Sequence, residues 1–105
     1  MHDVAVGLPI MREAAFLMTG RLKMMANPDR LLLLCQLAGG EQSVRELEER
    51  LDIRQPTLSQ QLAVLRTEGA VCTRREGKHV FYCIADEKLL RVLQTLYDLY
   101  CRAGP

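Results

Sequence analysis

The stretch that most constrains the fold runs from Ser43 to Leu65 and has the pattern of two short helices joined by a tight turn. Ser43 is followed three residues later by Glu46, which is a capping box: each side chain can accept a hydrogen bond from the other residue's backbone N–H. Apolar residues then recur at helical spacing, at Val44, Leu47 and Leu51. This pattern predicts a first helix that buries one narrow apolar stripe, followed by a three-residue turn.

The second helix of this stretch is predicted to begin at Pro56, because the fixed φ and missing N–H of proline suit a first helical position. Its buried stripe is formed by Leu58, Leu62 and Leu65. The opposite face carries no charge before Arg66 and consists of Pro56, Thr57, Gln60, Ala63 and Val64, with Ser59 at its margin. Glutamine pairs bidentately with adenine, and serine or threonine bonds to several base edges, so this thin polar face suits a major groove. The alternative is an ordinary surface helix of a small bundle.

A hairpin is predicted between Val71 and Ile84, where two β-branched or aromatic runs flank a Glu-Gly-Lys turn. Gly69, just before it, stands where a helix C-terminus is expected. The tip concentrates four basic residues, Arg74, Arg75, Lys78 and His79. A basic hairpin after a helix-turn-helix acts as a wing that contacts phosphates or a minor groove. A solvated turn would carry the same charges.

Length and composition indicate one globular domain over residues 1–105, because 49% of the residues are hydrophobic and 26% are charged. The two-helix stretch and the basic hairpin predict that this domain is a DNA-binding winged helix-turn-helix. No apolar run is long enough to span a membrane, and a cytoplasmic location is expected. The formal charge of only +1 predicts that two copies bind DNA together, since one copy offers few phosphate contacts. No CxxC motif, cofactor loop or nucleophile with a base partner is apparent, so we expect neither an enzyme nor a cofactor.

Outside the central stretch, a loose terminus is predicted for residues 1–8, followed by a helix from Leu8 or Pro9 to Met25. Two further helices are predicted, one from Pro28, after the cap Asn27, to about Ala38, and one from the cap Asp86 to about Cys101. The fold class is therefore mainly α with a β-hairpin. The first and last helices carry more apolar surface than a chain of this size can bury, so they are predicted to form a homodimer seam. A symmetric dimer would place two recognition helices ~34 Å apart, for a pseudo-palindromic operator in double-stranded DNA.

The four cysteines are Cys35, Cys72, Cys83 and Cys101. Without a CxxC pair, and with only His2 and His79 as imidazoles, they argue against a structural zinc site. In a cytosolic protein the thiols should rest reduced, so structural disulfides are not expected. If Gly77 and Lys78 form a two-residue turn, however, Cys72 faces Cys83 across the hairpin and the thiols can couple. A longer turn would put them out of register, and two small strand residues without a role are the alternative.

The order of elements, with the segments Asn27-Pro28-Asp29-Arg30-Leu31, Gln55 to Leu62 and Arg74 to Tyr82, resembles the ArsR family of dimeric bacterial repressors. The resemblance covers roughly residues 10 to 102. It implies that an apo dimer binds an operator and releases it when an inducer binds. It also implies that the DNA-contacting positions of the first recognition turn are Gln55, Thr57, Ser59 and Gln60.

The chain departs from the metal-sensing members of that family. Their cysteine-bearing segment on the first helix of the helix-turn-helix corresponds to residues 41–47, which contain no cysteine and place Arg45 at one ligand position. Their other site would use Asp86, but Lys88 follows it, and Leu99 and Arg102 stand where later ligands would be. Positive side chains repel a divalent cation, so metal sensing at either site is not expected.

Cys35 and Cys101, in Leu-Leu-Cys-Gln-Leu and Leu-Tyr-Cys contexts, resemble the dithiol subgroup of BigR- and SqrR-type persulfide or redox sensors. This resemblance implies a repressor that releases its operator when the two cysteines become linked by a disulfide or polysulfide bridge, with a reactive sulfur species or an oxidant as inducer. The alternatives are a constitutive regulator or antirepressor with inert cysteines, a metal-responsive repressor with an atypical site, and an interaction module that does not bind DNA.

Overall fold

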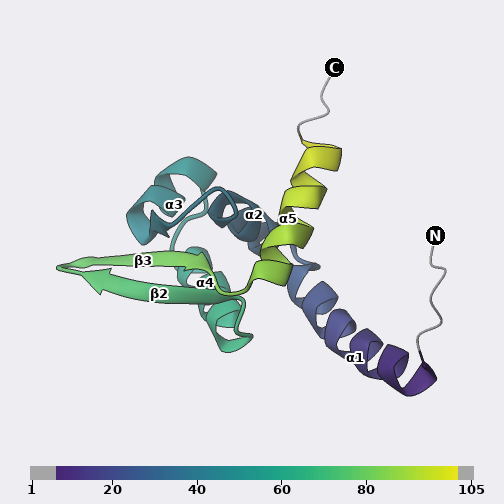
Figure 1. Cartoon of the computed structure of the whole chain (residues 1–105). Helices are drawn as coiled ribbons and strands as arrows, with labels where there is room; N and C mark the ends of the chain where they lie inside the picture. The colour runs from purple at the N-terminus through teal and green to yellow at the C-terminus, as the bar shows by residue number, and fades with distance from the viewer. Residues whose placement is uncertain (1–6, 102–105) are drawn as a thin grey trace.

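The computed structural model, which describes residues 7–101, combines helices with a small antiparallel sheet whose hairpin projects to one side (Figure 1). Within that range the order of elements is α1 (Leu8–Met25), α2 (Pro28–Leu37), β1 (Gln42–Ser43), α3 (Val44–Leu51), α4 (Thr57–Thr67), β2 (Val71–Glu76), β3 (His79–Ile84) and α5 (Glu87–Tyr100). The predicted loose terminus lies outside the described residues except for Gly7 and Leu8, and Leu8 already belongs to α1. The predicted succession of helix, helix, helix-turn-helix, wing and helix is confirmed.

Three helices begin at side-chain caps that the sequence predicted. Asn27 accepts a hydrogen bond from the N–H of Arg30 at the start of α2, and Asp86 accepts one from the N–H of Leu89 at the start of α5. The capping box of α3 is complete: Ser43 Oγ accepts from the Glu46 N–H, and the Glu46 carboxylate accepts from the Ser43 N–H. Each cap satisfies N–H groups that a helix start leaves without a partner.

The predicted start of α4 at Pro56 is wrong by one residue, because Pro56 is the N-cap and follows a cis peptide bond from Gln55. Proline has no side-chain acceptor with which to cap a helix. Gln55 supplies one instead: its Oε1 accepts from the Ser59 N–H at 3.1 Å and from the Ser59 hydroxyl at 2.6 Å. The helix therefore begins at Thr57, with its first turn ordered by the residue before the proline.

The core is built mainly from leucines around α2, which contacts α1, α3, α4, α5 and β3. The fully buried side chains include Leu33, Leu34, Leu37, Leu47, Leu58, Leu65 and Leu93. The predicted stripe of α4 is confirmed, since Leu58, Leu62 and Leu65 are all buried. Because α2 packs against both α3 and α4, a change in the position of α2 shifts both helices of the helix-turn-helix.

The sheet has the strand order β1-β3-β2, and the wing is its hairpin of β2 and β3, residues 71–84. Cys72 pairs with Cys83 and Glu76 pairs with His79, which leaves Gly77 and Lys78 as a two-residue turn. The predicted register is confirmed. Gly77 has a φ of +62°, in the region that such a turn requires and that glycine adopts without strain.

Strand β1 was not predicted. Gln42 pairs with Tyr82 and Ser43 pairs with Phe81, so β1 extends the sheet on the other side of β3. Two residues are too few to show the alternation by which a strand is recognised. Ser43 is both the last residue of β1 and the N-cap of α3, which joins the sheet directly to the helix-turn-helix.

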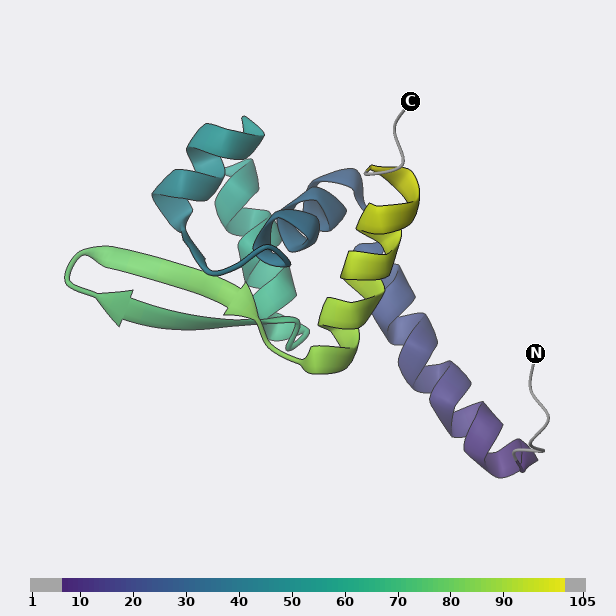
Figure 2. The same cartoon turned by 45° about the horizontal axis from the view of Figure 1, so that its top comes forward.

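Helices α1 and α5 present large apolar side chains to solvent, and α1 extends away from the other elements (Figures 1 and 2). On α1 the exposed set is Leu8, Ile10, Met11, Phe16, Leu17, Met18 and Leu22, and on α5 it is Val92, Tyr97, Leu99 and Tyr100. Phe16 is 78% exposed and Tyr100 is 81% exposed. Apolar surface of this extent is typical of a protein–protein interface. No helix among the described residues is long and apolar enough to cross a membrane.

Candidate nucleic-acid interface and cysteine pairs

The N-terminal half of α4 presents the predicted polar face. Gln55, Ser59 and Gln60 are exposed, and Thr57 is half-buried beside them. The hydrogen bonds between Gln55 and Ser59 hold two of these side chains in a fixed arrangement before any ligand arrives. The structure thus brings together all four predicted base-contacting residues on one helix start.

The wing places three of its four basic residues at its outer end. Arg75, Lys78 and His79 are exposed, and Lys78 lies in the turn itself. The His79 ring lies 6.3 Å from the Phe81 ring, centroid to centroid. In both views the wing projects from the body of the molecule (Figures 1 and 2). A projecting hairpin with exposed cations can reach the phosphates of a duplex.

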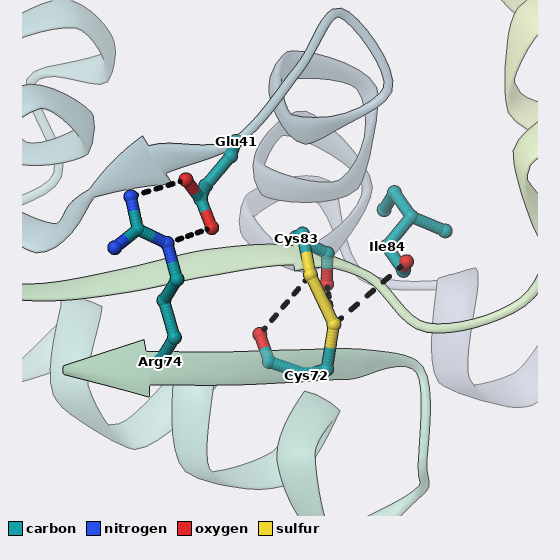
Figure 3. Close-up of a disulfide and its surroundings, with 5 residues drawn as sticks. All are labelled: Glu41, Cys72, Arg74, Cys83 and Ile84. Atoms are coloured by element: carbon teal, nitrogen blue, oxygen red, sulfur yellow. Dashed lines mark hydrogen bonds and ion pairs between the residues drawn. A yellow bond between two sulfur atoms is a disulfide. The ribbon is translucent and has the colours of Figure 1, made fainter.

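Arg74, the fourth basic residue, is engaged within the protein. Its Nε and Nη2 donate to the Glu41 carboxylate at 2.8 and 2.9 Å, as Figure 3 shows, and its Nη1 lies 3.5 Å from Glu76 Oε1. The guanidinium carbon stands 4.5 Å from the centroid of the Phe81 ring. The bond to Glu41 raises the pKa of Arg74. This bidentate pair ties the wing to the segment that precedes β1.

Cys35 lies on α2 and Cys101 at the end of α5, and these two helices are in contact. Cys35 is half-buried, and Cys101 is exposed at the C-cap of α5. Burial raises the pKa of the Cys35 thiol above its usual 9.0, and the charge of the neighbouring Cys101 raises it further. A cavity of about 320 Å³ adjoins Cys35 and is lined by Cys35, Ala38, Gly39, Gln94, Tyr97 and Asp98. Arg102, which follows Cys101 in the chain, lies outside the described residues.

Cys72 and Cys83 form a disulfide, with their Cα atoms 5.4 Å apart (Figure 3). The expectation that the thiols rest reduced is therefore wrong for this pair. The two-residue turn sets the register that places them directly opposite one another, at a Cα separation usual for a disulfide. The register was visible in the sequence, whereas the oxidation state was not.

Two arginines that the sequence did not single out link α1 to the helix-turn-helix and to α5. Arg30 donates to Met24 O at 2.6 Å and to Gln61 Oε1 at 3.1 Å, so it joins the end of α1 to α4. Arg21 donates to Glu68 O at 3.1 Å and to the Asp86 carboxylate at 2.9 Å. No sequence pattern marks Gln61, Glu68 and Asp86 as partners, because they lie 31 to 65 positions from the arginines that bind them.

Within residues 7–101, no group of three or more His, Cys, Asp and Glu side chains is arranged to hold a metal ion.

Comparison with known proteins places this arrangement among bacterial regulators. Residues 27–72 match the model of the bacterial regulatory protein, arsR family. The biofilm growth-associated repressor of Agrobacterium fabrum is 53% identical over 96 residues, which is 91% of this chain and 82% of that protein. The transcriptional activator HlyU of Vibrio cholerae is 46% identical over 83 residues, 79% of this chain and 77% of that protein. These relatives are transcriptional regulators rather than enzymes.

Solved structures match the whole fold as well. The transcriptional repressor BigR from Xylella fastidiosa superposes with a TM-score of 0.83 and 43% identity, over 91% of this chain and 98% of that one. Reduced HlyU from Vibrio cholerae superposes with a TM-score of 0.85 and 41% identity, over 90% of this chain and 99% of that one. The architecture of five helices and a hairpin over residues 7–101 is thus that of winged helix-turn-helix regulators.

Proposed function

The chain belongs to the ArsR family of DNA-binding transcriptional regulators, and from this premise we propose that it is a dimeric repressor that releases its operator when Cys35 and Cys101 become linked. The observation that supports the proposal is the contact between α2, which bears Cys35, and α5, whose C-cap is Cys101, beside a cavity lined by residues of both helices. The link is a disulfide or a polysulfide bridge. The inducer is a reactive sulfur species or another oxidant.

In the proposed complex, the start of α4 enters a major groove of double-stranded DNA. Gln55, Thr57, Ser59 and Gln60 contact base edges, because their amide and hydroxyl groups offer both donors and acceptors. Arg75, Lys78 and His79 of the wing contact the backbone or the minor groove. Arg74 acts through its bond to Glu41, which holds the wing in place.

The partner in the proposed assembly is a second copy of this chain. The exposed apolar side chains of α1 and α5 supply the seam, with Phe16 and Tyr100 among the most exposed. A two-fold dimer presents two copies of α4 to a pseudo-palindromic operator. A regulator that binds the bacterial chromosome works in the cytoplasm.

The proposed linking chemistry begins at Cys101, the exposed member of the pair. Its thiolate attacks a terminal sulfur of a polysulfide anion, and a persulfide forms while a shorter polysulfide leaves. Attack by the Cys35 thiolate on Cys101 Sγ then releases hydrosulfide and leaves a disulfide. If both residues carry a persulfide, attack by one outer sulfur on the inner sulfur of the other releases hydrosulfide and leaves a trisulfide.

The link acts on DNA binding through α2. This helix carries Cys35, contacts α4 directly, and holds Gln61 of α4 through Arg30. A bridge from Cys35 to α5 moves α2 and, with it, the α4 helices of the dimer out of the spacing that the operator requires. A 100-fold loss of affinity corresponds to about 2.7 kcal/mol, which is within the usual range of coupling between two sites.

The test is operator binding by gel shift, on the promoter region of the protein's own gene. Reduced protein is compared with protein treated with polysulfide and with peroxide, and intact masses are recorded in parallel. We expect polysulfide to abolish binding in the wild type and to cause no loss of binding in Cys101→Ser. Loss of binding that persists in Cys101→Ser would contradict the Cys35–Cys101 link and point to another thiol.

A second candidate function has one observation in its favour. The relative HlyU is named a transcriptional activator, so a regulator that displaces other DNA-bound proteins, with inert cysteines, fits the same fold. In that case reduced, polysulfide-treated and peroxide-treated protein would retard the promoter equally. Transcription from the promoter in vitro would then rise, rather than fall, on adding the protein in the presence of a competing repressor.

A further inference from the structure

The Cys72–Cys83 bond lies on the outer face of the wing. Paired residues of an antiparallel sheet share a face, so Cys72 and Cys83 lie on the same side as the Arg74–Phe81 pair. Val71 and Tyr82, one position away on each strand, point to the other side and are buried. Cys72 is exposed and Cys83 is half-buried. The two sulfurs are therefore at the surface, where a small thiol can reach them.

This bond closes a ring that contains the exposed cations of the wing. Cys72 and Cys83 are 11 positions apart, and Arg75, Lys78 and His79 all fall between them. Strand β1 pairs with β3 at Phe81 and Tyr82, so beyond that point the described wing is a hairpin of two strands. An isolated two-stranded hairpin is marginally stable in water. The crosslink at its base therefore contributes to the order of its tip.

We propose that Cys72 and Cys83 form a second thiol site, which opens and closes by exchange with dithiols and low-molecular-weight disulfides and thereby sets the order of the wing. The site shares no residue with the cavity beside Cys35 and Cys101. It is also on a different element of the fold. The exchange itself does not depend on the proposed function, whereas its effect on DNA binding does.

Opening requires two electrons from a dithiol. One donor thiolate attacks the exposed Cys72 sulfur, and Cys83 leaves as a thiolate that takes up a proton; the donor's second thiol then displaces Cys72 and the donor becomes a disulfide. In closing, the Cys72 thiolate attacks a low-molecular-weight disulfide and releases one thiol, and the Cys83 thiolate attacks Cys72 and releases the second. The sulfurs lie 3.6 and 3.7 Å from the carbonyl oxygens of Cys83 and Cys72, so in the open form each thiol has an acceptor (Figure 3).

The closed form binds DNA more tightly. The crosslink orders the hairpin before it meets DNA. When the cations of the wing bind the phosphates, the closed form therefore loses less conformational entropy than the open form does. Oxidation at this site therefore strengthens operator binding, whereas linking Cys35 to Cys101 releases the operator. The two pairs respond to thiol oxidation with opposite sign.

The exchange is tested in the variant Cys35→Ser/Cys101→Ser, in which this pair is the only remaining source of thiols. Folded protein is treated with dithiothreitol and then with oxidised glutathione, quenched with an alkylating agent and mapped by mass spectrometry. We expect two alkylated cysteines after the first step and a restored bond after the second. With Cys72→Ser added, Cys83 should retain one glutathione. A bond that resists dithiothreitol until the protein is unfolded, or that does not return, would overturn the proposal.

The effect on the wing is tested by hydrogen exchange and by fluorescence anisotropy with a duplex from the protein's own promoter. In the disulfide form, amides of residues 73–82 should exchange about fivefold more slowly. The duplex should bind about threefold to tenfold more tightly. When all four cysteines are replaced by serine, treatment with reductant and treatment with oxidant should give the same exchange rate and the same affinity. Equal exchange in the disulfide and dithiol forms would overturn the proposal that the bond orders the wing. Slower exchange in the disulfide form, with equal affinity of both forms for the duplex, would overturn the proposal that this order strengthens DNA binding. Failure of both forms to bind, with exchange as expected, contradicts the proposed function and leaves the thiol site standing.

Discussion

At the scale of single residues, the candidate interface depends on short polar side chains whose orientation is fixed before DNA is present. Gln55 both caps α4 and bonds the Ser59 hydroxyl, which leaves Gln60 as the exposed amide of the first turn that is free to face a base. Because α4 buries Leu58 and Leu62 on its other side, rotation of the helix cannot hide this amide.

Replacing Gln60 by alanine should weaken operator binding about tenfold, since a bidentate contact between an amide and adenine discriminates by roughly 1–3 kcal/mol. The loss should be confined to operators with the matching base, and random duplexes should bind both proteins equally. Anisotropy with the two duplexes measures this. Thr67→Ala, at an exposed position of the same helix, is the control, and an equal loss on random DNA would contradict base reading by Gln60.

The pKa of Cys35 gives a second prediction at this scale. Burial is the larger cause of the raised pKa and the charge of Cys101 is the smaller one. Cys101→Ser should therefore lower the pKa of Cys35 and make its labelling by iodoacetamide faster at pH 9. Because the folded protein keeps Cys35 protonated to a higher pH than the unfolded chain does, the free energy of unfolding should also fall as pH rises past 9.0. A labelling profile that Cys101→Ser does not move would contradict the electrostatic effect of Cys101 on Cys35.

At the scale of elements, the N-terminus of α5 is a junction of three helices. Asp86 accepts from the Leu89 N–H at 2.7 Å and pairs with Arg21 at 2.9 Å, while Arg21 also binds the end of α4 through Glu68 O. The wing is held by a comparable pair, since Arg74 joins β2 to Glu41 ahead of β1. Side chains from one element thus fix the ends of others.

Asp86→Ala should lower the free energy of unfolding by about 1–2 kcal/mol, mostly through loss of the helix cap. Arg21→Ala should cost less than about 1 kcal/mol, because both side chains of the pair are more than a third exposed and solvent weakens their attraction. Urea unfolding at one fixed protein concentration measures both. Glu87→Ala, whose pair with Arg91 is about three-quarters exposed, should have almost no effect. An equal loss in Glu87→Ala would contradict the special role of the cap.

The pair of Arg74 and Glu41 predicts that Arg74→Gln and Glu41→Gln weaken operator binding alike, by roughly fivefold at most, because solvent weakens the attraction in an exposed ion pair. The slope of log affinity against log salt should change in neither variant. If Arg74 instead binds a DNA phosphate, that slope should become shallower by about 0.9 in Arg74→Gln alone. Salt titrations of both variants therefore separate a residue that supports the wing from one that binds DNA.

The elements themselves were largely predictable from the sequence, because caps and helical spacing are local signals. Asn27, Ser43 and Asp86 mark helix starts, and the register of the wing follows from a two-residue turn. Interactions over long sequence distances were not predictable. Nothing local to Arg74 identifies Glu41, which lies 33 positions earlier, and β1 is too short to carry a pattern.

At the scale of the whole molecule, apolar surface is concentrated on the two terminal helices and polar surface on α4 and the wing. The predicted seam and the predicted DNA face are thus on different elements of the fold, joined through α2. Arg30 of α2 links the end of the seam helix α1 to Gln61 in the middle of α4, and Arg21 of α1 binds Glu68 at the C-terminal end of α4.

Phe16→Glu should separate the proposed dimer, because it places a charge on one of the most exposed apolar positions of α1. Size-exclusion chromatography with light scattering should give the mass of one chain, against two for the wild type, and operator affinity should fall more than about tenfold. Glu13→Gln, also exposed on α1, should remain dimeric. A dimeric Phe16→Glu protein would place the seam elsewhere.

Ser43 belongs both to β1 and to the cap of α3, and this limits which segments of the protein can be exchanged with those of a relative. Because one residue ends β1 beside Phe81 and also caps α3, the wing is not a detachable module. A chimera that takes residues 71–84 from a relative would set a foreign β3 against the native Gln42 and Ser43. Such a graft needs residues 41–46 from the same donor. The unit to exchange in this fold is therefore a pair of segments distant in sequence, residues 41–46 and 71–84.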